Sequence, residues 1–126
     1  MGLRDGLTGL YNFGHLMGEL ERECQRTRRY ELDLSLAIVD VDGFADFNER
    51  FGALAGDDQL KLIARHCDSC FRTSDLMARY SGSQIAVLLP ETSAQNALIA
   101  CERLRKRVKE VPMVRQGSVL PCTVSI

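Results

Sequence analysis

Hydrophobic residues in the first half of the chain follow first a helical and then a strand-like spacing. Apolar side chains recur at helical spacing over residues 13–29, after Asn12, whose side chain can cap a helix. Residues 34–41 form a nearly continuous apolar run with branched side chains, which is typical of a central strand buried on both faces. A short helix that ends at Gly52 and a second helix that begins near Gly56 are expected next. The side chains of the short helix that should face inward are Phe44, Phe47 and Phe51.

The second half of the chain predicts a hairpin, a helix and a final strand. Two short strands over residues 79–90 should meet at the small-residue turn of residues 81–83. Thr92 or Ser93 can cap the helix that follows, and residues 122–126 are expected to form the last strand. The inner face of that helix should consist of Ala94, Ala97, Leu98, Cys101, Leu104 and Val108.

The predicted order is therefore helix, strand, helix, helix, hairpin, helix, strand. It indicates an α/β fold: an α+β sandwich with a ferredoxin-like βαββαβ core and helices packed on the sheet. The 126 residues suffice for one domain with one core, which we expect to span residues 1–126. Because the chain stops at residues 123–126 just as a strand begins, we expect a C-terminally truncated domain that lacks its last elements.

Composition narrows the choice of partners. Hydrophobic residues make up 45% and charged residues 26%, as in ordinary soluble domains, and no apolar run is long enough to span a bilayer. The net charge of −1 gives no general reason to bind DNA, RNA or a membrane. Two basic clusters are interpreted mainly as solvated helix faces, although a local anion site within them stays open. They are Arg22, Arg26, Arg28 and Arg29, and Arg103, Arg105, Lys106, Arg107 and Lys109.

Five scattered cysteines argue against a disulfide framework and for a reducing cytosol, so a cytoplasmic location is expected. Cys67 and Cys70 follow His66, which raises the alternative of a metal or redox site. A zinc site would need a second pair of ligands, and the other cysteines and His15 show no such spacing. Because Cys67 is in phase with the apolar face of its helix, a buried structural cysteine is favoured.

Four motifs occur in order along the chain and carry a resemblance to a known family. Residues 5–12, Asp-Gly-Leu-Thr-Gly-Leu-Tyr-Asn, resemble the D-x-L-T-G-L-x-N opening of the GGDEF (diguanylate cyclase) family. Residues 40–57 are similar to its D-x-D-x-F…N…G…G-D block. Residues 79–80, Arg-Tyr, stand where R-Y precedes the family's hairpin motif, and residues 123–126 match its T-V-S-I strand. The chain is identified as a degenerate member, with Ser-Gly-Ser-Gln-Ile in place of GGDEF or GGEEF.

The resemblance also implies a chemistry. The family joins two GTP molecules into cyclic di-GMP, one GTP on each domain of a dimer, and such phosphoryl transfer needs metal ions. Its magnesium is held by a strand-end aspartate, matched by Asp40, and by a hairpin carboxylate, matched here by Ser83. The next hairpin carboxylate is matched by Gln84. We therefore expect weak or absent magnesium binding, no metal site, no catalytic residues and no enzymatic activity.

At other positions of the family's GTP site, some residues differ from the family and others match it. Ser81 replaces the first hairpin glycine, and Ala45 replaces a lysine that contacts phosphate. Asn48 and Asp57 match the residues that recognise guanine in the family. A vestigial GTP site would therefore consist of Asp40, Asn48, Asp57, Ser83 and Gln84.

A second site is implied by residues 72–75, Arg-Thr-Ser-Asp. In the family an R-x-x-D at this distance before the hairpin forms the inhibitory site, or I-site, which binds cyclic di-GMP, and Arg103 matches an assisting arginine. The residue types suit guanine, because arginine can donate to O6 and N7 while a carboxylate accepts from the N1–H and amino group. The alternatives are a surface ion pair between Arg72 and Asp75 and a solvent-facing Arg103.

Three hypotheses follow for the function. The first is a catalytically inactive bacterial cyclic di-GMP receptor that binds an intercalated dimer of the dinucleotide at Arg72, Asp75 and Arg103. Such a receptor would signal to a protein partner or a neighbouring sensor domain, and could form a homodimer. The second is a ligand-free interaction or dimerisation module, and the third is a residual GTP-binding regulatory domain.

Overall fold

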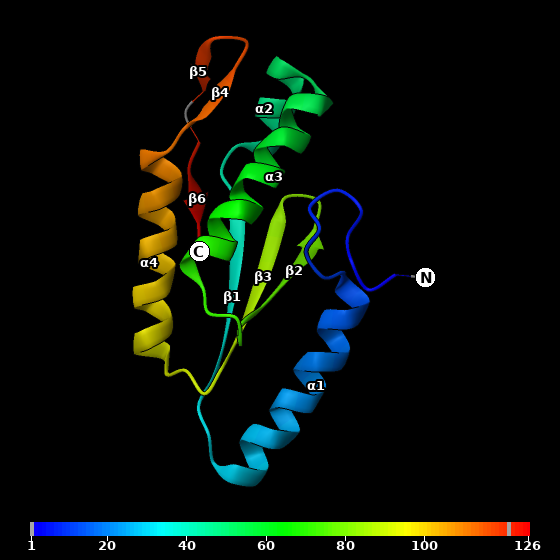
Figure 1. Ribbon diagram of the computed structural model, residues 1–126, viewed down its shortest axis with the longest axis vertical. Helices are drawn as coiled ribbons and strands as arrows, with labels where there is room; N and C mark the ends of the chain where they lie inside the picture. Colours follow the sequence, from blue (N-terminus) through cyan, green and yellow to red (C-terminus); the bar gives the residue numbers. More distant parts are fainter. Residues whose placement is uncertain (1, 121) are drawn as a thin grey trace.

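The main sheet has four strands in the order β2-β3-β1-β6 (Figure 1). The computed structural model describes residues 2–120 and 122–126. Each pair of neighbouring strands is antiparallel, so β1 and β2 run in the same direction with β3 between them. This is the ferredoxin-like arrangement that the sequence predicted. The strands are β1 (Leu34–Val41), β2 (Leu76–Ser81), β3 (Gln84–Pro90) and β6 (Val124–Ser125).

The helices begin where the sequence offers caps. Asn12 Oδ1 accepts a hydrogen bond from the His15 amide at 2.9 Å, and Ser93 Oγ accepts one from the Asn96 amide at 3.2 Å. Both caps were predicted. The helices are α1 (Phe13–Tyr30), α2 (Phe44–Phe51), α3 (Ala53–Cys70) and α4 (Ala94–Glu110).

Alternate residues of the strands feed two apolar clusters on opposite faces of the sheet. Val39 and Val87 join residues of α3 and α4, including Ile63 and Leu104, in the larger cluster. Leu88, on the opposite face of the sheet, packs with Leu16 of α1 in the smaller cluster. The helices α3 and α4 therefore cover one face, and α1 covers part of the other.

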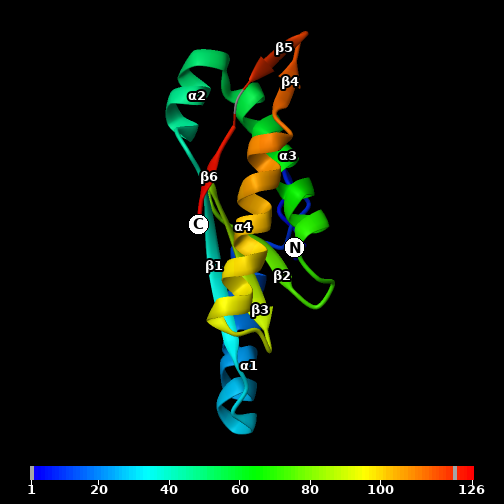
Figure 2. The same cartoon turned by 90° about the vertical axis from the view of Figure 1, so that its left-hand side faces the viewer.

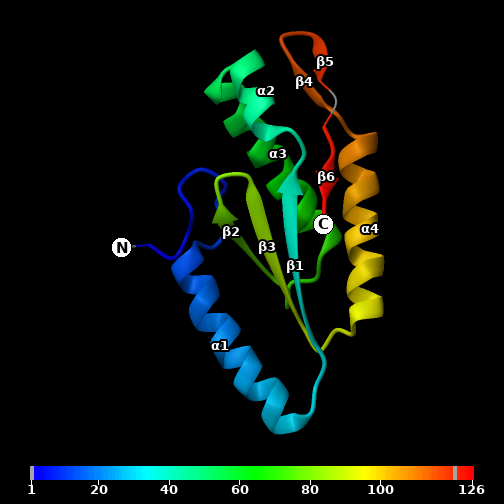
Figure 3. The same ribbon diagram turned by 180° about the vertical axis from the view of Figure 1, so that it is seen from behind.

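The prediction that β1 is buried on both faces was only partly right. In Figure 3, α1 lies beside β1 rather than across it. Leu36, in the middle of β1, is 46% exposed on this face. The apolar run indicated correctly that β1 is central in the sheet. Whether the side chains on each face of β1 are buried depends on where the helices pack, which the run does not show.

One end of the molecule is formed by α2 and a second hairpin (Figure 2). This hairpin pairs β4 (Met113–Arg115) with β5 (Ser118–Leu120). Its turn residues Gln116 and Gly117 both have positive φ, at 51° and 78°, as a tight hairpin turn requires. This hairpin was not predicted, because strands of three residues are too short to show a clear alternation of apolar and polar side chains.

Several predicted details were wrong. The helix expected to begin near Gly56 begins at Ala53, directly after Gly52. Phe51 is 40% exposed, and its ring packs on Phe47 instead of entering the core. Ala94 and Leu98 lie on the outer face of α4, with Leu98 65% exposed, because only four of the six predicted positions meet the sheet and α3. The last strand is shorter than predicted, since only residues 124–125 pair with β1.

Within the described residues, no helix has the length and apolar character needed to cross a membrane.

Replacing Gly56 with alanine should destabilise the packing of α2 on α3. Gly56 is buried, and a Cβ atom there would lie 1.7 Å from Asn48 Oδ1, so the asparagine or the helices must move. We expect Gly56→Ala to lower the free energy of unfolding by about 1–3 kcal/mol. Thermal unfolding followed by circular dichroism measures this loss.

Gly18→Ala is the matched control. Gly18 also lies within a helix, is exposed, and has no heavy atom within 4 Å of the added methyl position. Alanine is the better helix former by about 1 kcal/mol, so this variant should be as stable as the wild type or more so. A Gly56→Ala protein as stable as the Gly18→Ala protein would contradict the predicted clash.

Candidate functional site

The turn between β2 and β3 lies against Asp40 near the end of β1. The register of the sheet sets Asp40 opposite Gln84, and the Val41 amide donates to the Ser83 carbonyl at 3.1 Å. Ser83 Oγ donates to one oxygen of the Asp40 carboxylate at 3.2 Å, and Gln84 Nε2 approaches the other at 3.4 Å. The structure thus brings together Asp40 and Ser83, which match the family's metal-holding residues, and Gln84, which matches the next hairpin carboxylate.

These residues do not fit a tightly held magnesium ion. Asp40 is the carboxylate that faces the hairpin, and neutral side chains already occupy both of its oxygens. The nearby Asp42 carboxylate accepts hydrogen bonds from Thr123 and Ser125 instead. Across residues 2–120 and 122–126, no group of three or more His, Cys, Asp or Glu side chains is arranged to hold a metal ion. Magnesium favours carboxylates together with phosphate oxygens, and a hydroxyl and an amide supply no charge.

Asn48 and Asp57, the predicted guanine-recognition residues, meet where α2 packs on α3. Asn48 lies against Gly56, the residue before Asp57, and this contact requires the absence of a side chain at Gly56. Asn48 Oδ1 is buried and has no hydrogen-bond donor among the described residues. A buried acceptor without a partner is costly, so this atom marks a place where a donor is missing.

The Arg72–Asp75 pair forms a tight turn at the opposite end of the sheet, just before β2. Asp75 Oδ2 accepts from the Arg72 amide at 2.9 Å, and Asp75 Oδ1 accepts from Arg72 Nη2 at 3.1 Å. Arg72 Nη2 also donates to the Pro90 carbonyl at 3.1 Å and to Thr92 Oγ1 at 2.6 Å. The side chain of Asp75 is only 2% exposed, whereas that of Arg72 is 58% exposed. The buried carboxylate therefore holds the exposed guanidinium in a fixed orientation.

Arg103 reaches the same region from α4. Its Nη2 donates to the Cys70 carbonyl, at the end of α3, at 2.9 Å. Arg72, Asp75 and Arg103 line one pocket of about 250 Å³, which they share with Thr92 and other neighbours. The structure thus gathers three residues that lie up to thirty-one positions apart in the sequence (103 minus 72). Whether they bind a ligand stays a prediction.

Thr92 was not predicted as part of this pocket. From the sequence, Thr92 was expected only as a possible helix cap, and that role belongs to Ser93. Thr92 is buried, and its hydroxyl lies between Arg72 and the Pro90 carbonyl. Its side-chain chemistry alone gave no signal, because the contact depends on β3 ending beside the Arg72 turn.

The motif of residues 5–12 serves to position the chain before α1. The Asp5 carboxylate accepts from the amide and hydroxyl of Thr8 at 2.9 and 2.8 Å and pairs with Arg79 at 3.5 Å. Burial opposes ionisation of Asp5, but these hydrogen bonds and the charge of Arg79 outweigh it and lower the pKa of the carboxyl. The motif thereby ties the N-terminal loop to β2.

The cysteines agree with the structural interpretation. Cys67 is fully buried, and burial raises the pKa of its thiol to about 12. A thiol with such a pKa stays protonated near neutral pH and is a poor nucleophile and metal ligand. Cys67 packs in the core between the sheet and α4, as its helical phase predicted.

Comparison with known proteins places the chain in a family. The family described as "Diguanylate cyclase, GGDEF domain" matches residues 3–126. The chain is 42% identical over 123 residues to "Diguanylate cyclase DgcP" of Pseudomonas aeruginosa, covering 98% of this chain and 18% of that protein. It is thus similar to less than a fifth of the length of this relative.

Solved structures show the same fold. The chain superposes on diguanylate cyclase SiaD of Pseudomonas aeruginosa, solved in complex with its activator SiaC, with a TM-score of 0.94 and 36% identity. The match covers 98% of this chain and 48% of SiaD. The GGDEF domain of DgcB from Caulobacter crescentus, solved in complex with c-di-GMP, gives a TM-score of 0.92 at 27% identity, covering 99% of this chain and 75% of that one.

These comparisons correct one prediction. The hairpin without carboxylates led us to expect that the chain is not an enzyme. That expectation was wrong, because the matching family is described as diguanylate cyclase, and the relatives DgcP of Pseudomonas aeruginosa and DgcC of Escherichia coli are named a diguanylate cyclase and a probable diguanylate cyclase.

Adding a carboxylate to the hairpin should make the stability of the protein depend on magnesium. In Ser83→Glu a second negative charge would stand beside Asp40, which destabilises the fold without a cation and creates a divalent-ion site with one. We expect the Tm of Ser83→Glu to rise on addition of magnesium chloride by several degrees more than that of the wild type. Ser83→Gln, similar in size but neutral, is the control. An equal response of the Glu and Gln variants to magnesium would refute the prediction.

Proposed function

Because the chain belongs to the GGDEF domain family, we propose that it is a cyclic di-GMP signalling domain that binds the dinucleotide at Arg72, Asp75 and Arg103. The observation that carries the proposal is that these three residues, from three separate segments, line one pocket. The related DgcB domain, solved in complex with c-di-GMP, supports it. The test is direct titration of the protein with cyclic di-GMP.

Arg72 is the residue best placed to recognise a guanine. Asp75 and Thr92 hold its Nη2 nitrogen, and its Nη1 nitrogen donates to no acceptor among the described residues. A guanidinium fixed in this way loses little conformational entropy when a ligand binds. The free Nη1 group can donate to guanine O6 or N7, the acceptors through which arginine recognises guanine. Asp75, which is buried, acts mainly by positioning Arg72.

The size and charge of the pocket suggest how the dinucleotide would lie. A volume of about 250 Å³ lies at the lower end of small-molecule pockets, so it suits one base rather than a whole dinucleotide. Arg103, exposed at the rim, adds a positive charge suited to a phosphate or a second base. The rest of the ligand would then lie outside, where it can contact a second dinucleotide, a protein partner or another copy of the domain.

The setting of such a domain is also part of the proposal. The chain spans less than a third of the length of the curated relatives DgcP, DgcC and PleD that it matches. We infer a bacterial cytoplasmic protein in which occupancy of the pocket is passed to a neighbouring domain or a protein partner.

A second candidate function is the binding of GTP at the family's guanine position. The buried Asn48 Oδ1 has no donor, and the N1–H or amino group of guanine would supply one. The half-buried Asp57 follows Gly56 in α3. This candidate uses residues at the opposite end of β1 from the Arg72 pocket.

Calorimetric titration with cyclic di-GMP tests the first proposal. Removing a charged hydrogen bond between arginine and guanine costs about 1–3 kcal/mol, so Arg72→Ala should weaken binding by roughly tenfold to a hundredfold. Arg105→Ala is the matched control, since Arg105 lies on α4 but pairs with Glu102 and is not part of the pocket. Absence of binding by the wild type, or equal binding by Arg72→Ala, would refute the proposal.

Thermal shifts with GTP test the second candidate. Binding to the folded state should raise the Tm. The rise should be lost in Asn48→Ala and in Asp57→Ala but retained in Arg72→Ala, because Arg72 lies at the other end of the sheet. If GTP shifts the Tm of none of these proteins, or of all of them alike, the chain has no guanine site at Asn48.

A further inference from the structure

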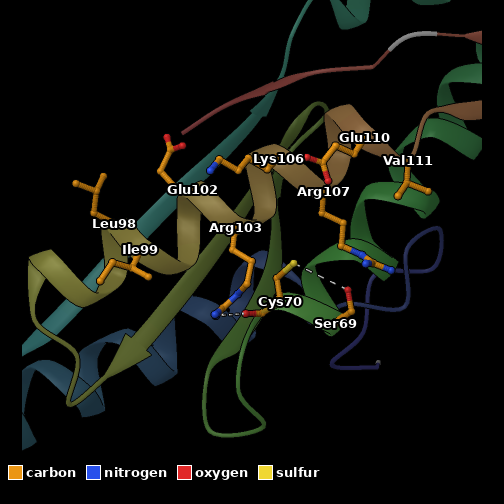
Figure 4. A pocket seen from close by; sticks show the side chains of 10 residues that line it. All are labelled: Ser69, Cys70, Leu98, Ile99, Glu102, Arg103, Lys106, Arg107, Glu110 and Val111. Carbon is orange, nitrogen blue, oxygen red and sulfur yellow. Dashed lines mark hydrogen bonds between the residues drawn. The ribbon is translucent and has the colours of Figure 1, made fainter.

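A groove beside α4 adjoins the Arg72 pocket and shares Cys70 and Arg103 with it. It lies between α4 and the last residues of α3, and Figure 4 shows its walls. Its volume is about 740 Å³, roughly three times that of the Arg72 pocket. Such a volume on a helix surface suits a segment of another protein better than a small ion.

The wall of the groove has a regular pattern. Ile99, Arg103, Arg107 and Val111 line it and are spaced four residues apart. Side chains at this spacing stand one above another on one helix face, about 6 Å apart along the axis. Arg103 and Arg107 extend toward the end of α3 in Figure 4. The wall therefore presents two positive charges, one turn apart, between two apolar residues.

The apolar residues of this wall are unusually exposed. Leu98, Ile99 and Val111 are 65%, 60% and 43% exposed. Leu98 and Ile99 lie at one end of the groove and Val111 at the other, so the apolar contacts flank the arginines. Exposed apolar groups gathered along a groove are typical of surfaces that bind another molecule.

The charges of the groove are incompletely balanced. Among the residues that the structure describes, neither Lys106 nor Arg107 has an acidic group within ion-pair distance, and Arg103 donates to a neutral carbonyl. Glu102 is already paired with Arg105 at 2.9 Å. Burial, and then the charge of Arg107, lower the pKa of the adjacent His66, so this histidine stays neutral near pH 7 and neither balances nor adds to the charge of Arg107. The groove thus has unsatisfied positive charge beside apolar surface.

We propose that this groove binds an acidic amphipathic helix of a partner protein. Two carboxylates four residues apart on such a helix would match Arg103 and Arg107, and an apolar residue on either side would cover Ile99 and Val111. A flat anionic surface such as a membrane fits less well. Glu102 and Glu110 lie along the outer edge of the groove and would repel it, whereas a narrow helix passes between them and α3.

Arg103 belongs to both the groove and the Arg72 pocket. Binding of the helix does not require the dinucleotide, and its test is independent of the proposed function. If both ligands bind, they compete for one guanidinium, so each weakens the other. That consequence alone rests on the proposed function.

Fluorescence anisotropy with a labelled peptide tests the proposal on the 126-residue chain. The probe is a helical peptide of about 18 residues, with two glutamates four residues apart and a leucine four residues outside each. We expect saturable binding that weakens as salt is added, and a Kd about tenfold higher for Arg107→Glu. A peptide with lysines in place of both glutamates should not bind.

Lys109→Glu is the matched control, because it makes the same charge change on α4 outside the groove and should leave the Kd within about twofold. Ile99→Ser, an exposed change, should weaken binding without lowering the Tm. Arg72→Ala should not alter peptide binding, which separates this site from the nucleotide pocket. Absent or salt-independent peptide binding, equal loss in Arg107→Glu and Lys109→Glu, or binding to anionic lipid vesicles but not to the peptide would each overturn the proposal.

Discussion

The antiparallel register between β1 and β3 fixes the position of both candidate sites. It runs from Leu34 opposite Pro90 to Asp40 opposite Gln84. One end of this ladder places the hairpin turn against Asp40, and the other places the end of β3 beside the Arg72 turn. A slip of one residue would exchange the buried and exposed faces of β3 and move both sets of contacts together. Because Val39 and Val87 are fully buried, the apolar core holds this register.

The two ends of the ladder use carboxylates in opposite ways. Asp40 accepts hydrogen bonds from neutral side chains, remains half-buried and forms no ion pair with any of the described residues. Asp75 is buried and is balanced by the guanidinium of Arg72. A buried charge is tolerated when it is paired and hydrogen-bonded, and its partner is then held rigidly. The Arg72 end therefore has an arginine oriented before any ligand arrives, whereas the hairpin end has a carboxylate and two neutral side chains.

The surface of helix α4 has three parts: one packs in the core, one contacts α3 and one is exposed to solvent. Leu104 and Val108 bind it to the core, Arg103 reaches the end of α3, and Ile99 and Leu98 remain exposed. This division explains why a helical pattern alone misplaced Leu98. The stripe of apolar residues on α4 is wider than the part that the sheet and α3 can cover, so the excess faces solvent. The exposed part coincides with the groove beside α3.

The sequence by itself determined the order of the main elements, the cap at Asn12 and a cap at Thr92 or Ser93, because these depend on local spacing and local hydrogen bonds. It determined the family through a resemblance of motifs. It also identified Arg72, Asp75 and Arg103, but only through a resemblance of motifs. Tertiary structure alone decided that these three line one pocket, that Thr92 joins them, and that Asp75 is buried behind Arg72. It also decided which side of β1 is covered and which apolar residues of α4 remain exposed. Those features depend on contacts between segments far apart in the chain, and no local pattern records which surfaces will meet.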